Sequence, residues 1–355
     1  MSRKNQLKRR LRIAFALLAV GITVTIAPLD LLPVWIAPLP DSVKEQVDAA
    51  IEEGLDGIIV YVDQAGKPPA FYSAGWKNKQ LEVPADPHAL FKIASVNKLY
   101  VAAALTKMAH KGILSLDDTL STHMPELSVR IANADRVTLR MMVRHRSGIP
   151  NFTDDQAFDW FEPMPDEDAI LELIQGDPAD FEPDSDYSYS NSNYVLLRMV
   201  MDTALEYSHR QFIRDEILVP LGLTHVYFDL DEVAYDDVVS GYWYEYDDDL
   251  RELGGSTLAT AQDVGAFVRA LNDGSLFTKA EEATYSSIYE YGHDGWVPGY
   301  HTKAWYHEDI DAVVVQFVNT TGGATWGTAN IVGGKATGIS SIIYGRIIRI
   351  LRKQQ

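Results

Sequence analysis

Strand-like segments stand in pairs toward the two ends of the chain, and helical patterns fill most of the sequence between them. Residues 57–63 and 69–74 read as strands joined by a turn at Gly66, and residues 300–306 and 311–319 read as an antiparallel hairpin. The simplest way to pair all four segments is to bring the late hairpin back to the early one. We therefore predict one antiparallel sheet built from both chain ends.

The helical segments divide into those that would cover this sheet and those that would lie beside it. Residues 41–53 are amphipathic, and the C-terminal segment places five isoleucines on one face and Arg346, Arg349 and Arg352 on another. We expect these two helices to cover the sheet, and a mainly helical part over roughly residues 112–275 to form a second body. The predicted fold class is α/β, of the α+β type, with a site in the cleft between sheet and helices.

The N-terminus has the pattern of a membrane-directing segment. Residues 1–12 hold six Lys or Arg and no acid, and residues 13–29 are uncharged and apolar. This pattern predicts that residues 1–39 form a basic tail and an uncleaved membrane anchor, because proline follows both candidate cleavage points, Ala27 and Ala37. The alternatives are a cleaved signal segment and a buried core helix. In the two membrane-directed cases, residues 41–355 lie on the periplasmic or outer side of the cytoplasmic membrane.

Composition excludes several classes of function. The 355-residue chain has a formal net charge of −19, and its basic residues cluster only at the two ends, which argues against a nucleic-acid partner. Cysteine is absent, so disulfides, thiolate metal sites and a cysteine nucleophile are excluded. The nine histidines form no His-x-x-x-His pair, and we predict neither a metal nor another cofactor.

A Ser-x-x-Lys motif lies at the start of a predicted alanine-rich helix. Ser95 and Lys98 would share one face of that helix, one turn apart, and Lys98 could accept the proton of Ser95 if its pKa were lowered. Taken alone the motif is weak, because an ordinary helix start and a solvated lysine give the same pattern.

Two later motifs have matching chemistry. Tyr189 and Asn191 form a Tyr-x-Asn triplet just before another predicted helix, where a phenol can relay a proton and an amide can hold a carbonyl. His293 and Gly295 precede the late strands, where glycine would let a substrate approach the backbone. Each has an ordinary alternative, an aromatic loop with a helix cap in the first case and a hairpin turn in the second.

In this order and spacing, the three motifs resemble those of the serine β-lactamase and penicillin-binding protein superfamily. The resemblance is strongest to the branch of class C β-lactamases, D-alanyl-D-alanine carboxypeptidases and related esterases, and covers roughly residues 41–350. Residues 145–150 (HRSGIP) and 254–263 (GGSTLATAQD) resemble two further segments of that family.

The resemblance implies a role for each motif residue in acyl transfer. Ser95 would be the acylated nucleophile, Lys98 its base or proton relay, and Tyr189 a second acid or base. Asn191 would hold a substrate amide.

The motif around His293 and Gly295 would complete the substrate site. His293 and Gly295 would contact substrate, with His293 replacing the family's lysine as a neutral hydrogen-bonding group. The backbone amides of Ser95 and Trp296 would form the oxyanion hole.

Three residues depart from the family pattern. His293 stands where efficient β-lactamases usually have lysine, Trp296 where small residues are frequent, and Asp184 where glycine is usual. The resemblance thus implies a serine hydrolase acting through an acyl-enzyme on a small-molecule or peptide substrate, carboxypeptidase-like or esterase-like. A β-lactamase and a catalytically silent binding protein of the same fold are the competing hypotheses.

Overall fold

The computed structural model describes residues 28–325 and 333–355. Nearly all of the predicted anchor, residues 13–29, lies outside the described residues. Among the residues that are described, no helix combines the length and apolarity needed to cross a bilayer.

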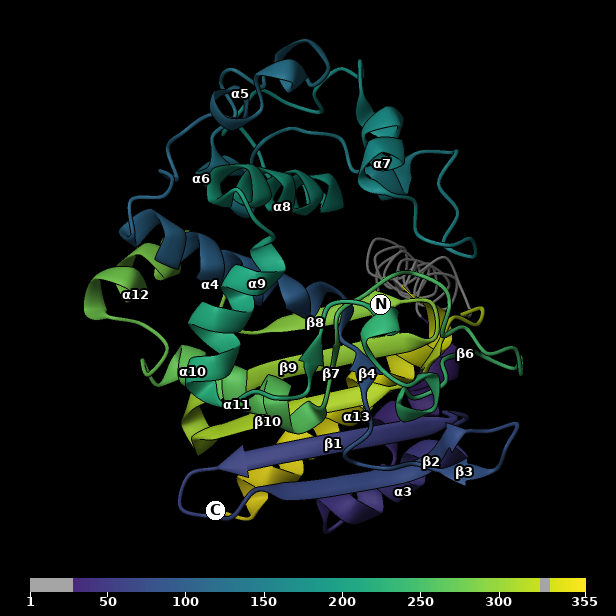
Figure 1. The fold of residues 1–355 in the computed structure, drawn as a ribbon. Helices are drawn as coiled ribbons and strands as arrows, with labels where there is room; N and C mark the ends of the chain where they lie inside the picture. Colours follow the sequence, from purple (N-terminus) through teal and green to yellow (C-terminus); the bar gives the residue numbers. More distant parts are fainter. Residues whose placement is uncertain (1–27, 326–332) are drawn as a thin grey trace, which may run out of the picture.

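A six-stranded antiparallel sheet forms the base of the molecule, in the order β3-β2-β1-β10-β9-β8 (Figure 1). β1 pairs with β10 over seven residues, from Ile58 opposite Val318 to Gln64 opposite Ala312. The prediction of one sheet built from both chain ends is therefore confirmed. The strands are β1 (Gly57–Gln64), β2 (Ala70–Asn78), β3 (Val83–Pro84), β8 (His293–Val297), β9 (Tyr300–His307) and β10 (Ala312–Val318).

The terminal helices α3 (Val43–Glu52) and α13 (Gly334–Lys353) pack against one face of the sheet. Ser42 and Glu45 form a capping box that fixes the start of α3. The cluster between these helices and the sheet is largely aliphatic, with Val47, Val60, Val314 and Ile343 fully or almost fully buried. The sequence predicted this face.

One arginine of α13 lies on a different side from the one predicted. Arg346 was expected on a polar face with Arg349 and Arg352, but its side chain is buried. Its guanidinium donates to the carbonyls of Ala37 (2.8 Å) and Pro38 (2.6 Å), just after the short helix α2 (Leu32–Ile36). The physical reason is that these carbonyls follow the end of α2 and need donors, which a long cationic side chain can supply.

The opposite face of the sheet carries α11 (Ala261–Asn272), which contacts β1, β9 and β10. The predicted helical part, residues 112–275, therefore includes one helix that packs on the sheet. The other helices lie above the sheet in Figure 1, except the short α10, which lies beside α11. They are α4 (Asn97–His110), α5 (Leu120–His123), α6 (Leu139–Val143), α7 (Glu167–Ile174), α8 (Asn191–Leu205), α9 (His209–Ile213), α10 (Val219–Leu221) and α12 (Lys279–Ser286).

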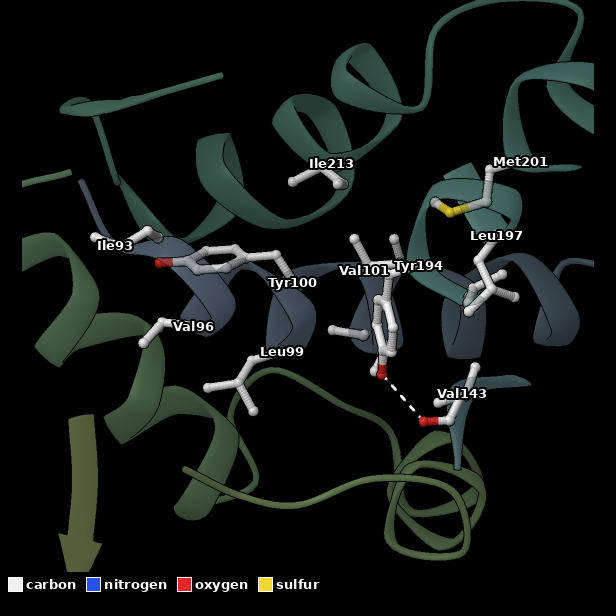
Figure 2. Packing of buried hydrophobic residues seen from close by; sticks show 14 of the residues in the cluster. Ile93, Val96, Leu99, Tyr100, Val101, Val143, Tyr194, Leu197, Met201 and Ile213 are labelled. Atoms are coloured by element: carbon white, nitrogen blue, oxygen red, sulfur yellow. Dashed lines mark hydrogen bonds between the residues drawn. The ribbon is translucent and has the colours of Figure 1, made fainter. Parts of the chain in front are cut away.

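Helix α4 is the centre of the larger apolar core. Figure 2 shows Leu99, Tyr100 and Val101 packed with Leu197 and other side chains from the neighbouring helices. Nearly every residue of α4 is buried, so the helix has little freedom to move relative to its neighbours. Its N-terminal end is thereby held in place, and this is the end that carries Ser95 and Lys98.

Two small sheets connect the loops to this frame. β4 (Phe91–Lys92) pairs with β7 (Leu258–Ala259), which also pairs with β5 (Val226–Tyr227). β6 (Tyr242–Trp243) pairs in parallel with β11 (Thr320–Thr321). The first of these sheets brings the glycine-rich segment around Gly255 beside the turn that precedes α4.

Candidate active site

Ser95 lies in a single 3-10 turn, Ala94–Val96, between β4 and α4. Ala94 has φ = +48°, a left-handed conformation that is unfavourable for a residue with a side chain. Its amide donates to the hydroxyl of Ser256 at 2.8 Å, and the amide of Ile93 donates to the Thr257 carbonyl at 3.0 Å. The segment 254–263 therefore holds the turn that presents the serine.

Lys98 lies one helical turn beyond Ser95, and its side chain is buried. Its Nζ is 3.2 Å from the Ser95 Oγ and 2.9 Å from the Asn191 Oδ1. Burial, and then the charge of the nearby Arg198, lower the pKa of Lys98 to about 7. A substantial neutral fraction is therefore present near pH 7, and a neutral amine can accept a proton from Ser95.

Tyr189 approaches Ser95 from the other side. Its hydroxyl donates to the Ser95 Oγ at 2.9 Å, and burial raises the pKa of Tyr189 to about 12. The phenol is therefore protonated at neutral pH and suited to act as an acid. The His145 ring stacks on it with centroids 4.4 Å apart.

His145 supports the tyrosine without facing Ser95. Its Nδ1 accepts a hydrogen bond from the Ser190 amide at 3.1 Å. Burial, followed by the charge of Lys98, lowers the pKa of His145 to about 3, so the ring is neutral. These contacts give His145 a structural role beside Tyr189.

Asn191 is the first residue of α8 and is tied down on three sides. Its Oδ1 accepts from Lys98, its Nδ2 donates to Thr153 Oγ1 at 3.4 Å, and its backbone amide donates to Asn151 Oδ1 at 2.9 Å. In this structure the amide therefore orients Lys98. Its predicted contact with substrate stays a prediction.

Strand β8 forms the opposite wall and passes very close to the serine turn. A Cβ at Gly295 would lie 2.3 Å from the carbonyl oxygen of Ile93, so only glycine fits there. This close approach places the next residue, Trp296, beside the Ser95 turn, as an oxyanion hole from their two amides would require.

His293 begins the same strand. Its Nδ1 is hydrogen-bonded to the carbonyl of Asp294, and because a carbonyl can only accept, Nδ1 carries the proton. Burial, followed by the charge of Lys98, lowers the pKa of His293 to about 4. The ring is therefore neutral at pH 7 and its Nε2 is an acceptor. Its centroid is 6.3 Å from that of Tyr189.

These side chains line a cleft of about 1350 Å³ between the sheet and the helical body. The cleft contains all the motif residues named from the sequence, which are Ser95, Lys98, Tyr189, Asn191, His293, Gly295 and Trp296. The Trp296 ring meets Trp160 edge-to-face at 5.3 Å and forms an aromatic wall on one side. Among the described residues, no group of three or more His, Asp or Glu is arranged to hold a metal ion.

The departure at Asp184 has a local explanation. Asp184 has φ = +64°, the left-handed conformation that glycine adopts most easily. Arg146 offsets the cost of this conformation, because its Nε donates to the Asp184 carboxylate at 2.5 Å. The loop before Tyr189 therefore keeps a glycine-like backbone without glycine.

Several residues of the site were not found from the sequence. Asn151 and Thr153 hold Asn191, and Ser256 holds Ala94, while Arg198 lies further along the cleft. Ser256 lies in the segment 254–263, which the sequence identified as similar to the family. Its hydrogen bond to the Ala94 amide could not be predicted. The others look like ordinary loop or helix-surface residues in the sequence.

A buried lysine and a tyrosine on one serine form an arrangement that can activate the serine as a nucleophile. The chain matches the family model described as Beta-lactamase over residues 43–289. It therefore belongs to the Beta-lactamase family, and the predicted resemblance is confirmed.

Among curated proteins, the chain is 27% identical over 198 residues to Protein flp of Staphylococcus aureus, which covers 54% of this chain and 39% of flp. It is also 27% identical over 286 residues to Penicillin-binding protein 4* of Bacillus subtilis, covering 72% of this chain and 60% of that protein. The matched stretch thus spans less than two thirds of each of these relatives.

Solved structures confirm the predicted fold. The D-amino acid amidase of Ochrobactrum anthropi superposes with a TM-score of 0.75 at 19% identity, covering 88% of this chain and 98% of the amidase. A penicillin-binding protein of Bacillus halodurans gives a TM-score of 0.67 at 22% identity, with 84% and 98% covered. The mixed α/β fold is that of β-lactamase-like hydrolases.

Proposed function

We propose that the protein is a serine hydrolase that forms an acyl-enzyme at Ser95 on a peptide, amide or ester. One observation carries the proposal: the Ser95 Oγ lies within hydrogen-bonding distance of both the Lys98 Nζ (3.2 Å) and the Tyr189 hydroxyl (2.9 Å). A nucleophile placed between a base and an acid is the arrangement that two-step acyl transfer needs.

The reaction follows from the protonation states. Neutral Lys98 takes the proton of Ser95 as the Oγ attacks the substrate carbonyl carbon, and the amides of Ser95 and Trp296 stabilise the oxyanion. Tyr189 gives its proton to the leaving nitrogen or oxygen as that bond breaks, and regains one from Lys98. Water then attacks the acyl ester, its proton passes back through the same groups, and the acid product leaves.

The substrate class is proposed from the relatives and the site together. The similar structures include an enzyme described as a D-amino acid amidase and one described as a hydrolase with promiscuous acyltransferase activity. A neutral His293 in place of a permanent cation favours peptide, amide or ester substrates over β-lactams. β-Lactam hydrolysis remains an outcome that the test below detects.

The test compares Ser95→Ala with Ser275→Ala, a matched change at an exposed serine. Wild type and Ser275→Ala should react covalently with a fluorophosphonate or penicillin probe, with the adduct on Ser95 by mass spectrometry. Ser95→Ala should lose the adduct and about 10³- to 10⁶-fold in hydrolysis, with unchanged thermal unfolding. Near-normal hydrolysis by Ser95→Ala would refute the assignment.

A substrate panel then defines the activity. Peptides ending in D-Ala-D-Ala, short-chain p-nitrophenyl esters and nitrocefin should be assayed on the same protein. We expect hydrolysis of the peptides or esters to exceed that of nitrocefin. The reverse order would identify a β-lactamase, and probe labelling without turnover of any substrate would favour a binding protein.

We also propose, from residues 1–39, that the catalytic domain is anchored to the outer side of the cytoplasmic membrane. N-terminal sequencing of protein extracted from membranes tests this. A mature chain that begins between residues 28 and 42 would show that the segment is cleaved.

A further inference from the structure

A second cation lies in the cleft, further from the serine. Arg198 follows Asn191 by seven residues on α8, which is almost two helical turns, and both side chains line the cleft. Seven residues advance a helix by about 10 Å and return to nearly the same face. Helical side chains lean toward the N-terminus, so the guanidinium is directed back toward Lys98. Its charge lowers the pKa of Lys98, which indicates electrostatic proximity.

The guanidinium of Arg198 has no partner in the described part of the protein. The partly or fully buried Arg251, Arg269 and Arg346 are all paired, with Asp249, with Asp63, or with backbone carbonyls. Arg198, also partly buried, has neither a hydrogen bond nor an ion pair there. Its nitrogens are not among the fully buried polar atoms that lack a partner, so its five donors face the cleft and are open to a ligand.

The charges around Arg198 leave this position open. Asp202 is held by His209, whose Nδ1 lies 2.8 Å from its carboxylate, and Arg210 lies 3.8 Å from Asp229. Glu167 is exposed and lies beyond ion-pair distance of Arg198. Among the described residues, Glu167 and Asp202 thus attract the guanidinium only from beyond ion-pair distance, and a closer carboxylate can still bind it.

We propose that Arg198 is a specificity residue that binds a carboxylate of the substrate at a point in the cleft away from the scissile carbonyl. The inference rests on the proposed acyl-enzyme function. The rise of about 10 Å from Asn191 to Arg198 sets the scale: at about 3.3–3.6 Å per residue of extended peptide, the carboxylate lies within about three residues of the bond that is cleaved. The substrates are thus acidic peptides or amides of that length.

Matched substrates test this. Two sets of peptide pairs are needed, one on the acyl side and one on the leaving side. Within each pair the peptides differ only in a carboxylate or a carboxamide, placed one, two or three residues from the scissile bond. We expect wild type to prefer the carboxylate member of at least one pair by about 10- to 100-fold in kcat/KM, mainly through KM. Arg198→Gln should remove this preference. The preference is a ratio of two substrates measured on one enzyme, so a change in the pKa of Lys98 does not alter it.

Two further variants serve as controls. Arg198→Lys keeps the charge without the planar fork, so it should retain part of the preference. Arg210→Gln removes an exposed arginine that also lines the cleft, and should retain all of it. If Arg198→Gln fails to fold, the Arg198→Lys result and competition between matched carboxylate and carboxamide inhibitors of wild type decide the question.

The outcomes separate the two proposals. Equal rates on both members of every pair, or a preference that survives Arg198→Gln, would overturn the role of Arg198. Labelling of Ser95 without hydrolysis of any of the peptides would do the same while leaving the acyl-enzyme proposal intact. Failure of Ser95 to label in wild type would overturn both.

Discussion

Two buried lysines flank the nucleophile, and their surroundings differ in kind. Lys92, at the end of β4, donates to the backbone carbonyls of Arg251 and Leu253, and burial lowers its pKa to about 8 although acidic neighbours oppose the shift. Lys98 donates only to side chains, and a cation, Arg198, adds to the effect of burial.

The difference separates a structural lysine from a reactive one. Fixed carbonyls need the ammonium protons of Lys92 and keep that residue charged and stationary. The Ser95 hydroxyl can switch from acceptor to donor, and a neutral Lys98 keeps two N–H groups for the Asn191 Oδ1, so Lys98 can release and recover a proton. Burial alone does not distinguish the two residues.

The largest expected effect is on activity, and it distinguishes Lys98 from Lys92. Lys98→Met should lower kcat/KM by about 10³- to 10⁴-fold with little change in stability, because it removes the base. Lys92→Met should keep activity within about tenfold but lower the free energy of unfolding by about 1–3 kcal/mol, because two buried carbonyls lose their donor. Hydrolysis assays and urea unfolding of both variants measure this. Similar losses of activity in both would remove the distinction.

The turn between the lysines gives the next largest effect. Gly295→Ala places a Cβ 2.3 Å from the Ile93 carbonyl and must push β8 away from Ser95. We expect about a 10²-fold loss of kcat, since a displaced oxyanion donor costs this much. Gly345→Ala, in α13, has no atom near the added Cβ and is the control. Equal activity of the two variants would show that β8 does not position the serine turn.

The pH dependence should be smaller. Only neutral Lys98 accepts a proton, so kcat/KM should rise about tenfold between pH 6 and pH 8 around its pKa of about 7. His293→Ala should leave the position of this rise unchanged, because the pKa of His293 is already lowered to about 4. Arg198→Gln removes a nearby positive charge and should move the rise to higher pH. A rate that falls over this range in wild type would contradict a neutral lysine base.

Substitution of a third buried cation, Arg346, should have the smallest effect on activity. It extends the comparison of Lys92 and Lys98. Arg346 is held by backbone carbonyls, as Lys92 is, and lies on the other side of the sheet. Arg346→Gln should therefore behave like Lys92→Met, with the free energy of unfolding reduced by about 2 kcal/mol and activity unchanged. Arg349→Gln, an exposed neighbour on the same helix, should change neither. A loss of activity in folded Arg346→Gln would contradict this.

Much of the sheet and the core of the site could be predicted because local patterns determined them. The strands at both chain ends have apolar runs, and Ser95, Lys98, Tyr189 and Asn191 stand in motifs whose spacing sets their geometry. The contacts of the Asn191 amide with Lys98 and Thr153 were not part of that prediction, and its contact with substrate stays a prediction.

What could not be predicted depends on contacts distant in sequence. Arg346 follows the polar spacing of its helix, and only the fold brings the carbonyls of Ala37 and Pro38 to it. Arg198 resembles any helical surface arginine until α7, α8 and α9 are placed around it. Ser256 is an ordinary loop serine until β4 and β7 pair. These long-range contacts leave no periodic signal in the sequence.

The pairing of β1 with β10 has a consequence for how the chain acquires its structure during synthesis. Ile58 and Val318 are opposite each other, although 260 residues separate them in the chain. At a synthesis rate of about 5–20 residues per second, β1 waits roughly 13–52 s before its partner strand exists. Throughout that interval the edge of β1 that β10 will cover is open to pairing with other chains, and this exposure ends only when residue 318 has been made.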